Sequence, residues 1–270
     1  MVVTNNDITL KNYKKLSIQV SLSGLSFCVF DLLSHNILSL QSIEFPKNQV
    51  IEEQLWKAFS EFTVLSERHD EVMIIHDNNL NTFVPQSLFD ENYLGSYLQY
   101  NIKVFESDLF AFDSLKKQEI NNVYVPYVNI NNFLLDQYSS FDYVHASTLF
   151  VDTVLDISRY NFEKQVFIHI KEKHFEIAVV QGGNLVFYNS FEPTTPEDFI
   201  YYTLFTFEQL QLNPDNCKVN FIGKINREHE YFKIAYKFIR NCEIYNVQSI
   251  ADKLNITEEK TLENFILIHS

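Results

Sequence analysis

Glycine is scarce in this chain, with 5 residues among 270. Loops that bind phosphate use glycine because their backbone must approach the phosphate closely or adopt positive φ angles. The low count therefore argues against a glycine-rich nucleotide loop.

Positive charge is also scarce. The chain has 21 Lys and Arg against 35 Asp and Glu, a formal net charge of -14 and a pI near 4.9. Nucleic-acid binding depends on clustered basic side chains that neutralise phosphates, so the sequence predicts no nucleic-acid partner. A protein partner with a basic surface is compatible with this charge.

Cysteine and long apolar runs are lacking as well. The three cysteines, Cys28, Cys217 and Cys242, have no paired spacing, so neither a disulfide framework nor a metal site is predicted. No run reaches the roughly 18 apolar residues of a membrane span, and the polar start at Thr4-Asn5-Asn6-Asp7 is unlike a signal peptide. We therefore expect a cytoplasmic location.

Aromatic residues, in contrast, are abundant, with 25 Phe and 15 Tyr. Packing in a hydrophobic core is the commoner explanation for such a surplus, because soluble proteins rarely expose large apolar patches. Tyr93, Tyr97 and Tyr100 are spaced by four and three residues on a predicted helix over 91–100 and would form one stripe. This stripe is a candidate site for an unknown protein partner.

A series of strands and helices occurs twice, which predicts an internal duplication. In the first copy we expect three strands, a helix and a strand, at 16–24, 25–33, 37–45, 50–62 and 72–75. In the second copy we expect three strands, a helix, a strand and a helix, at 166–170, 174–180, 185–191, 196–210, 218–223 and 231–239. Between the copies we expect a strand and two helices, at 122–128, 133–138 and 145–158. These expectations predict two domains, 1–144 and 145–270.

This order of elements, over residues 16–246, resembles the actin-like ATPase superfamily, which includes sugar kinases, heat-shock chaperones and bacterial actin homologues. The chain also resembles an uncharacterised bacterial family of about this size with an actin-like fold and no assigned function. The resemblance implies a duplicated α/β, ribonuclease H-like fold. Each of its two lobes would contain a mixed five-stranded sheet flanked by helices.

The superfamily carries the motif Asp-x-Gly-Thr in its first hairpin, where a carboxylate organises metal and backbone amides hold phosphate. Here Ser21 aligns with the aspartate and Ser23 with the glycine, and in the second hairpin His169 aligns with the second aspartate. Lys171-Glu172-Lys173 stands where glycines are expected, and Gly223 is the one glycine left of the adenosine-binding pair. The resemblance places a degenerate cleft at Ser21, Ser23, Gly24, His169, Lys171 and Gly223.

Losing both acids and most glycines removes the parts on which phosphoryl transfer depends. We therefore expect a protein without ATPase or kinase activity that acts as an adaptor or scaffold, with no cofactor and no metal. One alternative is weak binding of ATP without hydrolysis. Another is an enzyme acting on an unknown small molecule in the cleft, with His169 as acid or base. Lys171 could bind a phosphate as a point charge, but a solvated hairpin turn is the commoner role of such a lysine.

Overall fold

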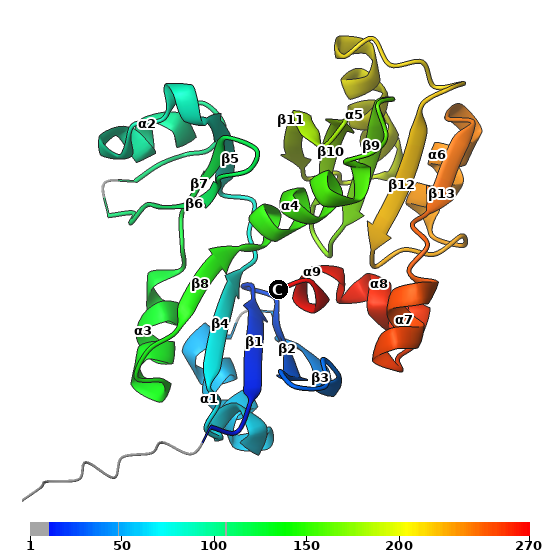
Figure 1. Cartoon of the computed structure of the whole chain (residues 1–270). Coiled ribbons are helices and arrows are strands. Elements are labelled where there is room, and N and C mark those ends of the chain that lie inside the picture. The colour runs from blue at the N-terminus through cyan, green and yellow to red at the C-terminus, as the bar shows by residue number, and fades with distance from the viewer. Residues whose placement is uncertain (1–10, 48, 106) are drawn as a thin grey trace, which may run out of the picture.

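The first lobe is built on a mixed sheet of five strands in the order β3-β2-β1-β4-β8. The computed structural model describes residues 11–47, 49–105 and 107–270, and Figure 1 shows its arrangement. The strands are β1 Lys14–Val20, β2 Gly24–Asp31, β3 Ile37–Glu44, β4 Glu71–His76 and β8 Asp142–His145. β2 is antiparallel to β1 and β3, whereas β4 is parallel to β1 and β8.

Two helices cover one face of this sheet, α1 Ile51–Glu61 and α3 Val128–Gln137, and a 3-10 turn follows α1 at Thr63–Ser66. Leu55 of α1 and Leu134 of α3 are fully buried against apolar strand residues such as Ile18. Apolar residues recur on α1 at helical spacing, and this spacing brings its apolar side to the sheet.

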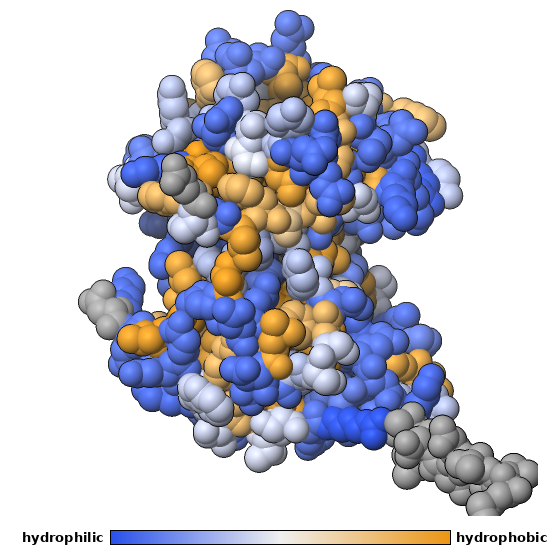
Figure 2. Space-filling view, turned by 90° about the vertical axis from the view of Figure 1, so that its left-hand side faces the viewer, coloured by the Kyte–Doolittle hydropathy of each residue, from blue (hydrophilic) through white to orange (hydrophobic). Residues whose placement is uncertain are grey.

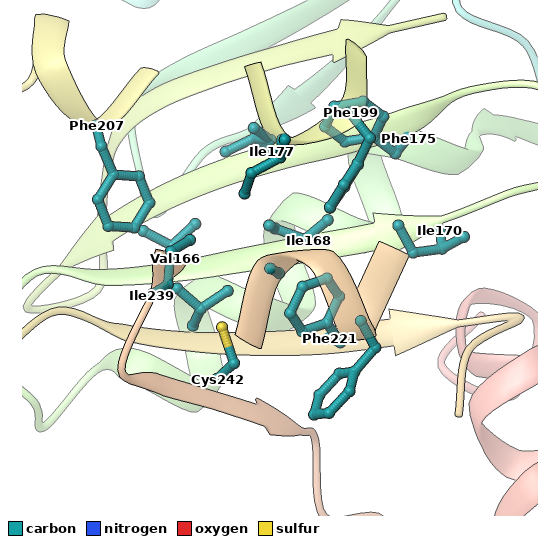
Figure 3. Close-up of a cluster of buried hydrophobic side chains, with 14 of the residues drawn as sticks. Val166, Ile168, Ile170, Phe175, Ile177, Phe199, Phe207, Phe221, Ile239 and Cys242 are labelled. Atoms are coloured by element: carbon teal, nitrogen blue, oxygen red, sulfur yellow. The ribbon is translucent and has the colours of Figure 1, made fainter. Parts of the chain in front are cut away.

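The second lobe repeats the plan with a sheet in the order β11-β10-β9-β12-β13. Its strands are β9 Gln165–Ile170, β10 Phe175–Gln181, β11 Asn184–Phe191, β12 Lys218–Gly223 and β13 Asn241–Ile244. Helices α5 Pro196–Gln209 and α6 Glu230–Phe238 pack on one face, where Phe199 and Phe221 lie among the buried side chains (Figure 3). Thr195 and Asp198 form a reciprocal capping box that starts α5.

The helix α4, Ala146–Ser158, covers the other face of the second sheet and lies between the lobes in Figure 1. Its fully buried Phe150 and Val154 pack in one cluster with Phe167 and Ala178 of the second sheet. The predicted helix over 145–158 is therefore confirmed.

Equivalent strands pair in the same register in the two sheets, which confirms the predicted fold class. Val20 pairs with Leu25 and His76, and Ile170 pairs in the same way with Phe175 and Gly223. Each lobe therefore contains a mixed five-stranded sheet flanked by helices, as the resemblance implied.

A small subdomain between β4 and α3 is the main departure from the sequence-based prediction. It contains the three-stranded sheet β5-β7-β6, seen at the upper left of Figure 1. Its elements are β5 Asn81–Pro85, 3-10 turns at Gln86–Leu88 and Glu91–Tyr93, α2 Leu94–Leu98, β6 Ala111–Leu115 and β7 Ile120–Tyr124.

Two local predictions fail in this region. The strand expected at 122–128 is β7, which ends at Tyr124 and belongs to the small sheet, whereas the fifth strand of the main sheet is the short β8. The helix expected at 91–100 is reduced to a 3-10 turn and the five-residue α2. Asn92 and Gly95 are poor helix formers, which accounts for the shortening.

The C-terminal helices return to the first lobe. They are α7 Gln248–Leu254, α8 Glu258–Glu263 and α9 Phe265–Ile268, and α9 contacts β1 and β2. Fully buried Leu267 shares a cluster with Cys28 of the first sheet and Phe167 of the second.

The division of the chain into two domains, residues 1–144 and 145–270, stays a prediction. Among the described residues, no helix has the length and apolar character needed to cross a membrane.

Candidate interlobe site

A cleft of about 660 Å³ lies between the lobes, at the hairpin turns β1-β2 and β9-β10. Five of the six residues predicted for the cleft line it, namely Ser21, Ser23, Gly24, His169 and Lys171. Gly223 is not part of the lining, although the next residue, Lys224, is. The structure thus brings the two predicted hairpins together, and ligand binding by these residues stays a prediction.

The first turn uses its polar groups internally. The Ser21 amide donates to the Gly24 carbonyl at 2.9 Å, and the Ser23 amide donates to Ser21 Oγ at 3.2 Å. A side chain on Gly24 would place its Cβ 2.5 Å from the carbonyl oxygen of Ile43, so glycine is required here for the approach of β3. The amides of Ser21 and Ser23 already have acceptors within the turn.

The second turn has the same geometry, since the Lys171 amide donates to the His174 carbonyl at 3.0 Å. The register makes Lys171, not His169, the counterpart of Ser21, because Lys171 follows Ile170 as Ser21 follows Val20. Ser21 and His169 therefore do not occupy equivalent positions, as the two alignments assumed, because His169 lies two residues before Lys171. Apolar Ile170 left the strand end ambiguous in the sequence.

The Lys171 side chain is buried, so the prediction of a solvated role was wrong for this lysine, whereas Glu172 and Lys173 of the same turn are exposed. The Lys171 side chain is 8% exposed, with Nζ 2.7 Å from Asp77 Oδ1 and 3.2 Å from Glu176 Oε2. The second oxygen of Asp77 accepts from Gln19 Nε2 at 2.7 Å. Asp77 follows β4 in the first lobe, so this ion pair joins the two lobes at the cleft.

The three charges hold one another ionised. Burial raises the pKa of Asp77 and of Glu176, but the Lys171 ammonium and the neighbouring histidines together outweigh burial and leave both pKa values below their usual range. Burial alone lowers the pKa of Lys171, but Asp77 and Glu176 more than compensate and raise it. The Lys171 ammonium and the two carboxylates are therefore charged at neutral pH.

Glu176 is the centre of a buried polar network. It is completely buried on β10 and accepts from His169 Nδ1 at 2.9 Å, from the Tyr188 hydroxyl at 2.7 Å and from the Ser147 hydroxyl. His169 is 4% exposed, so its side chain belongs to the interior of the protein. Sequence reasoning missed Glu176, although a carboxylate inside the run Phe175-Glu176-Ile177-Ala178 was a usable signal.

A second ion pair joins the lobes nearer to solvent. Lys224 Nζ lies 3.0 Å from Glu44 Oε1, with side chains 52% and 79% exposed. Gly223 directs this lysine through a backbone at φ +96°, where a Cβ would lie 2.2 Å from the carbonyl oxygen of Ile170. Gly223 thus allows the backbones of β12 and β9 to approach closely, which a residue with a Cβ would prevent.

Two histidines at this end of the sheets lack a partner for one ring nitrogen among the described residues, His174 at Nε2 and His76 at Nδ1. Burial lowers the pKa of each to about 4, so both rings are neutral at pH 7. In the part of the chain that the structure describes, no group of three or more His, Cys, Asp or Glu side chains is placed to hold a metal ion.

The predicted tyrosine stripe is divided by the structure. Tyr93 and Tyr100 are 59% and 83% exposed, but the Tyr97 hydroxyl donates to the Leu88 carbonyl and accepts from the Asp90 amide, each at 2.8 Å. Of the described residues of the small subdomain, none lines the interlobe cleft.

Comparison with known proteins identifies the same fold elsewhere. A crystal structure from Bacteroides thetaiotaomicron VPI-5482, described as a protein with actin-like ATPase fold and unknown function, matches with a TM-score of 0.81 and 25% identity over 92% of this chain and 98% of that one. The structure of the PilM-PilN type IV pilus biogenesis complex matches with a TM-score of 0.59 and 12% identity over 94% and 96% of the two chains. No curated protein matches. A family model described as protein of unknown function (DUF3822) matches residues 4–242, and the chain belongs to that family.

Proposed function

We propose that this protein is a non-catalytic actin-like adaptor that binds a protein partner and does not turn over ATP. The observation that carries the proposal is the Lys171 ammonium, buried between Asp77 and Glu176 at the interlobe cleft. In actin-like ATPases, to which the sequence is similar, carboxylates and metal organise this region. Here an internal ion pair joins the lobes instead.

The charge of the cleft supports the same conclusion. Its lining contains five carboxylates and three lysines, and two of the lysines are already paired: the carboxylates are Glu44, Asp77, Glu172, Glu192 and Glu263, and the lysines are Lys171, Lys173 and Lys224. A nucleoside triphosphate would bring further negative charge to a cleft that has an excess of it. The amides of Ser21 and Lys171 are also already bonded within their turns.

Thermal unfolding with and without millimolar Mg-ATP tests the loss of nucleotide binding. A ligand at about 100 times its dissociation constant stabilises by roughly 2.7 kcal/mol, which would raise the midpoint by several degrees. We expect no shift beyond that of Mg²⁺ alone. A saturable increase with Mg-ATP would overturn the proposal and favour the alternative of ATP binding without hydrolysis.

Among the described residues, no contact favours either alternative, namely ATP binding without hydrolysis or an enzyme that acts on a small molecule in the cleft. His169 is nearly buried, and its Nδ1 is bonded to Glu176, so the ring is poorly placed to act as an acid or base on a ligand. We also propose that the protein is cytoplasmic and has no nucleic-acid partner.

We place the partner site on the small subdomain. Among the described residues, its hydrophobic cluster has four buried and eight partly buried side chains, and Tyr93 and Tyr100 are exposed. Figure 2 views the molecule from the side of this subdomain and shows apolar residues at the surface of its upper half. Exposed aromatic side chains are typical anchors of protein interfaces. One structure of the same fold is of a complex, PilM-PilN, which is compatible with an adaptor role.

Purification of the tagged protein from its own cells tests this site. We expect the paired change Tyr93→Ala and Tyr100→Ala to remove a partner that co-purifies with the unaltered chain. Tyr160→Ala, which changes a tyrosine that is 87% exposed elsewhere, is the matched control. Retention of the partner by the paired variant would exclude this surface.

A further inference from the structure

A second hollow lies where the C-terminal helices meet the first sheet. Its volume is about 600 Å³, within the range of roughly 300–1,000 Å³ that is usual for small-molecule sites. It is lined by parts of β1, β2, the turn after β2, α7 and residues 268–270, and it shares no lining residue with the interlobe cleft. The two sites are therefore distinct.

Five of the twelve lining residues are apolar, and they come from both sides of the hollow. The first lobe contributes two half-buried side chains and the C-terminal helices three, namely Phe30, Leu32, Ile250, Leu254 and Ile268. Covering such surface with an apolar ligand group gains about 25 cal/mol per Å² removed from water. The hollow thus offers an apolar floor.

Basic side chains line the same hollow. Lys15, Lys253, His35 and His269 are all part of the lining. Among the described residues neither lysine ammonium takes part in an ion pair or a side-chain hydrogen bond. His269 donates Nδ1–H to the Phe265 carbonyl at 2.6 Å, and its Nε2 has no partner within the described part of the chain.

One carboxylate side chain, Asp31, opposes these cations in the described lining. Its Oδ1 accepts from the amides of Ser34 at 3.0 Å and Leu33 at 2.8 Å, and these bonds hold the pKa of Asp31 below its usual value. Asp31 is thus engaged by its own turn. Two lysines against one such carboxylate leave an excess of positive charge among the described lining side chains, in a chain whose net charge is -14.

We propose that this hollow binds an organic anion that consists of one carboxylate or phosphate group on an apolar body. The anionic group lies between Lys15 and Lys253, and the body lies on the apolar floor. Because the lining joins the first sheet to the C-terminal helices, a bound anion stabilises the folded chain. This site is independent of the proposed adaptor function.

Titration calorimetry on the full chain tests the proposal with octanoate and octyl phosphate as probes. Octanol, which lacks the charge, and inorganic phosphate, which lacks the apolar body, are the controls. We expect at least one octyl anion to bind one per chain, about tenfold or more tighter than either control, which corresponds to roughly 1.4 kcal/mol. The two octyl probes distinguish a carboxylate from a phosphate head group.

Two variants locate the binding. We expect Lys15→Gln combined with Lys253→Gln to weaken the bound octyl anion by about tenfold or more. Lys233→Gln, which removes a lysine of α6 that is paired with Glu228, should leave the affinity for the octyl anion unchanged. Equal affinity for octanol, equal weakening by Lys233→Gln, or no binding of either octyl anion would each overturn the proposal, whatever the outcome at the interlobe cleft.

Discussion

The two hairpins have the same backbone and opposite chemistry. Both turns close with the same amide-to-carbonyl bond, from Ser21 to Gly24 and from Lys171 to His174. The first turn is a neutral serine turn, whereas the second carries an ammonium that is 8% exposed and bonded to two carboxylates.

This difference separates what a sheet requires from what a site requires. Strand pairing fixes where the turn lies, and any residue that fits the turn satisfies it. The side chains at the first turn position are free to change. Here Ser21 bonds within its own turn, whereas Lys171 forms ion pairs with Asp77 and Glu176. The same fold can thus hold different side chains at equivalent turns.

The largest expected effect comes from removing the buried ammonium. Lys171→Met leaves the carboxylates of Asp77 and Glu176 unpaired, and breaking a buried ion pair in this way costs about 3–5 kcal/mol. At the equivalent position, Ser21→Ala should cost about 1 kcal/mol or less. Urea unfolding of both variants measures the difference, and equal losses would contradict the contrast between the hairpins.

The next effect concerns the residues that end β4 and β12, which the register makes equivalent. Gly223 has φ +96° and lies against the Ile170 carbonyl, whereas His76 needs no positive φ. Gly223→Ala should therefore destabilise by about 1–3 kcal/mol through backbone strain alone, and more through the clash. Urea unfolding checks this value, with Gly95→Ala as control, where the nearest atoms belong to the side chain of Phe110.

The second hairpin should also respond to pH, because it has His174 where the first has Gly24. Burial lowers the pKa of His174 to about 4 in the folded chain, so the unfolded chain binds more protons between that value and about 6.5. Stability is therefore full above pH 6.5 and is lost as the pH falls toward 4.

Replacing His174 isolates its contribution to the pH dependence of stability. We expect His174→Asn to remove about 2 kcal/mol from the stability lost between pH 7 and pH 5. His35→Asn, which alters an exposed histidine, should leave that loss unchanged. Unfolding curves at the two pH values decide the matter, and an unaltered pH dependence in His174→Asn would mean that the ring is not held neutral by burial.

The smallest effect distinguishes the two ion pairs that join the lobes. Glu44→Gln breaks an exposed pair and should cost about 0.5 kcal/mol or less, and even less at high salt. Asp77→Asn, in the buried pair, should cost about 3 kcal/mol. Unfolding at low and high salt measures both, and a larger loss for Glu44→Gln would reverse the assignment of Lys171 as the main link.

Much of the fold was predictable because local patterns agree with it. Thr195 followed by Pro196 marked the start of α5, and Gly182-Gly183 marked the hairpin before β11, where both glycines have positive φ. The small subdomain was not predictable in the same way. Its strands have five residues each, and β7 reads like a strand of the main sheet until pairing assigns it elsewhere.

The candidate site was only partly visible in the sequence. The two hairpin turns were evident, with Ser21 in the first and Lys171-Glu172-Lys173 in the second. The role of Asp77 was not evident, because an acid after a buried strand is an ordinary turn residue. Only the structure places Lys171 of the other lobe, 94 positions away, 2.7 Å from its carboxylate.

The sequence by itself determined the duplication, the order of elements and the polar residues at the two hairpin turns, because periodicity, turn residues and composition are local properties. Only the tertiary structure decided that Lys171 is buried and paired, that Gly223 serves a backbone contact and that the C-terminal helices complete the hollow on the first sheet. The physical reason is that burial and charge pairing depend on which distant segments meet, and no local pattern specifies that meeting.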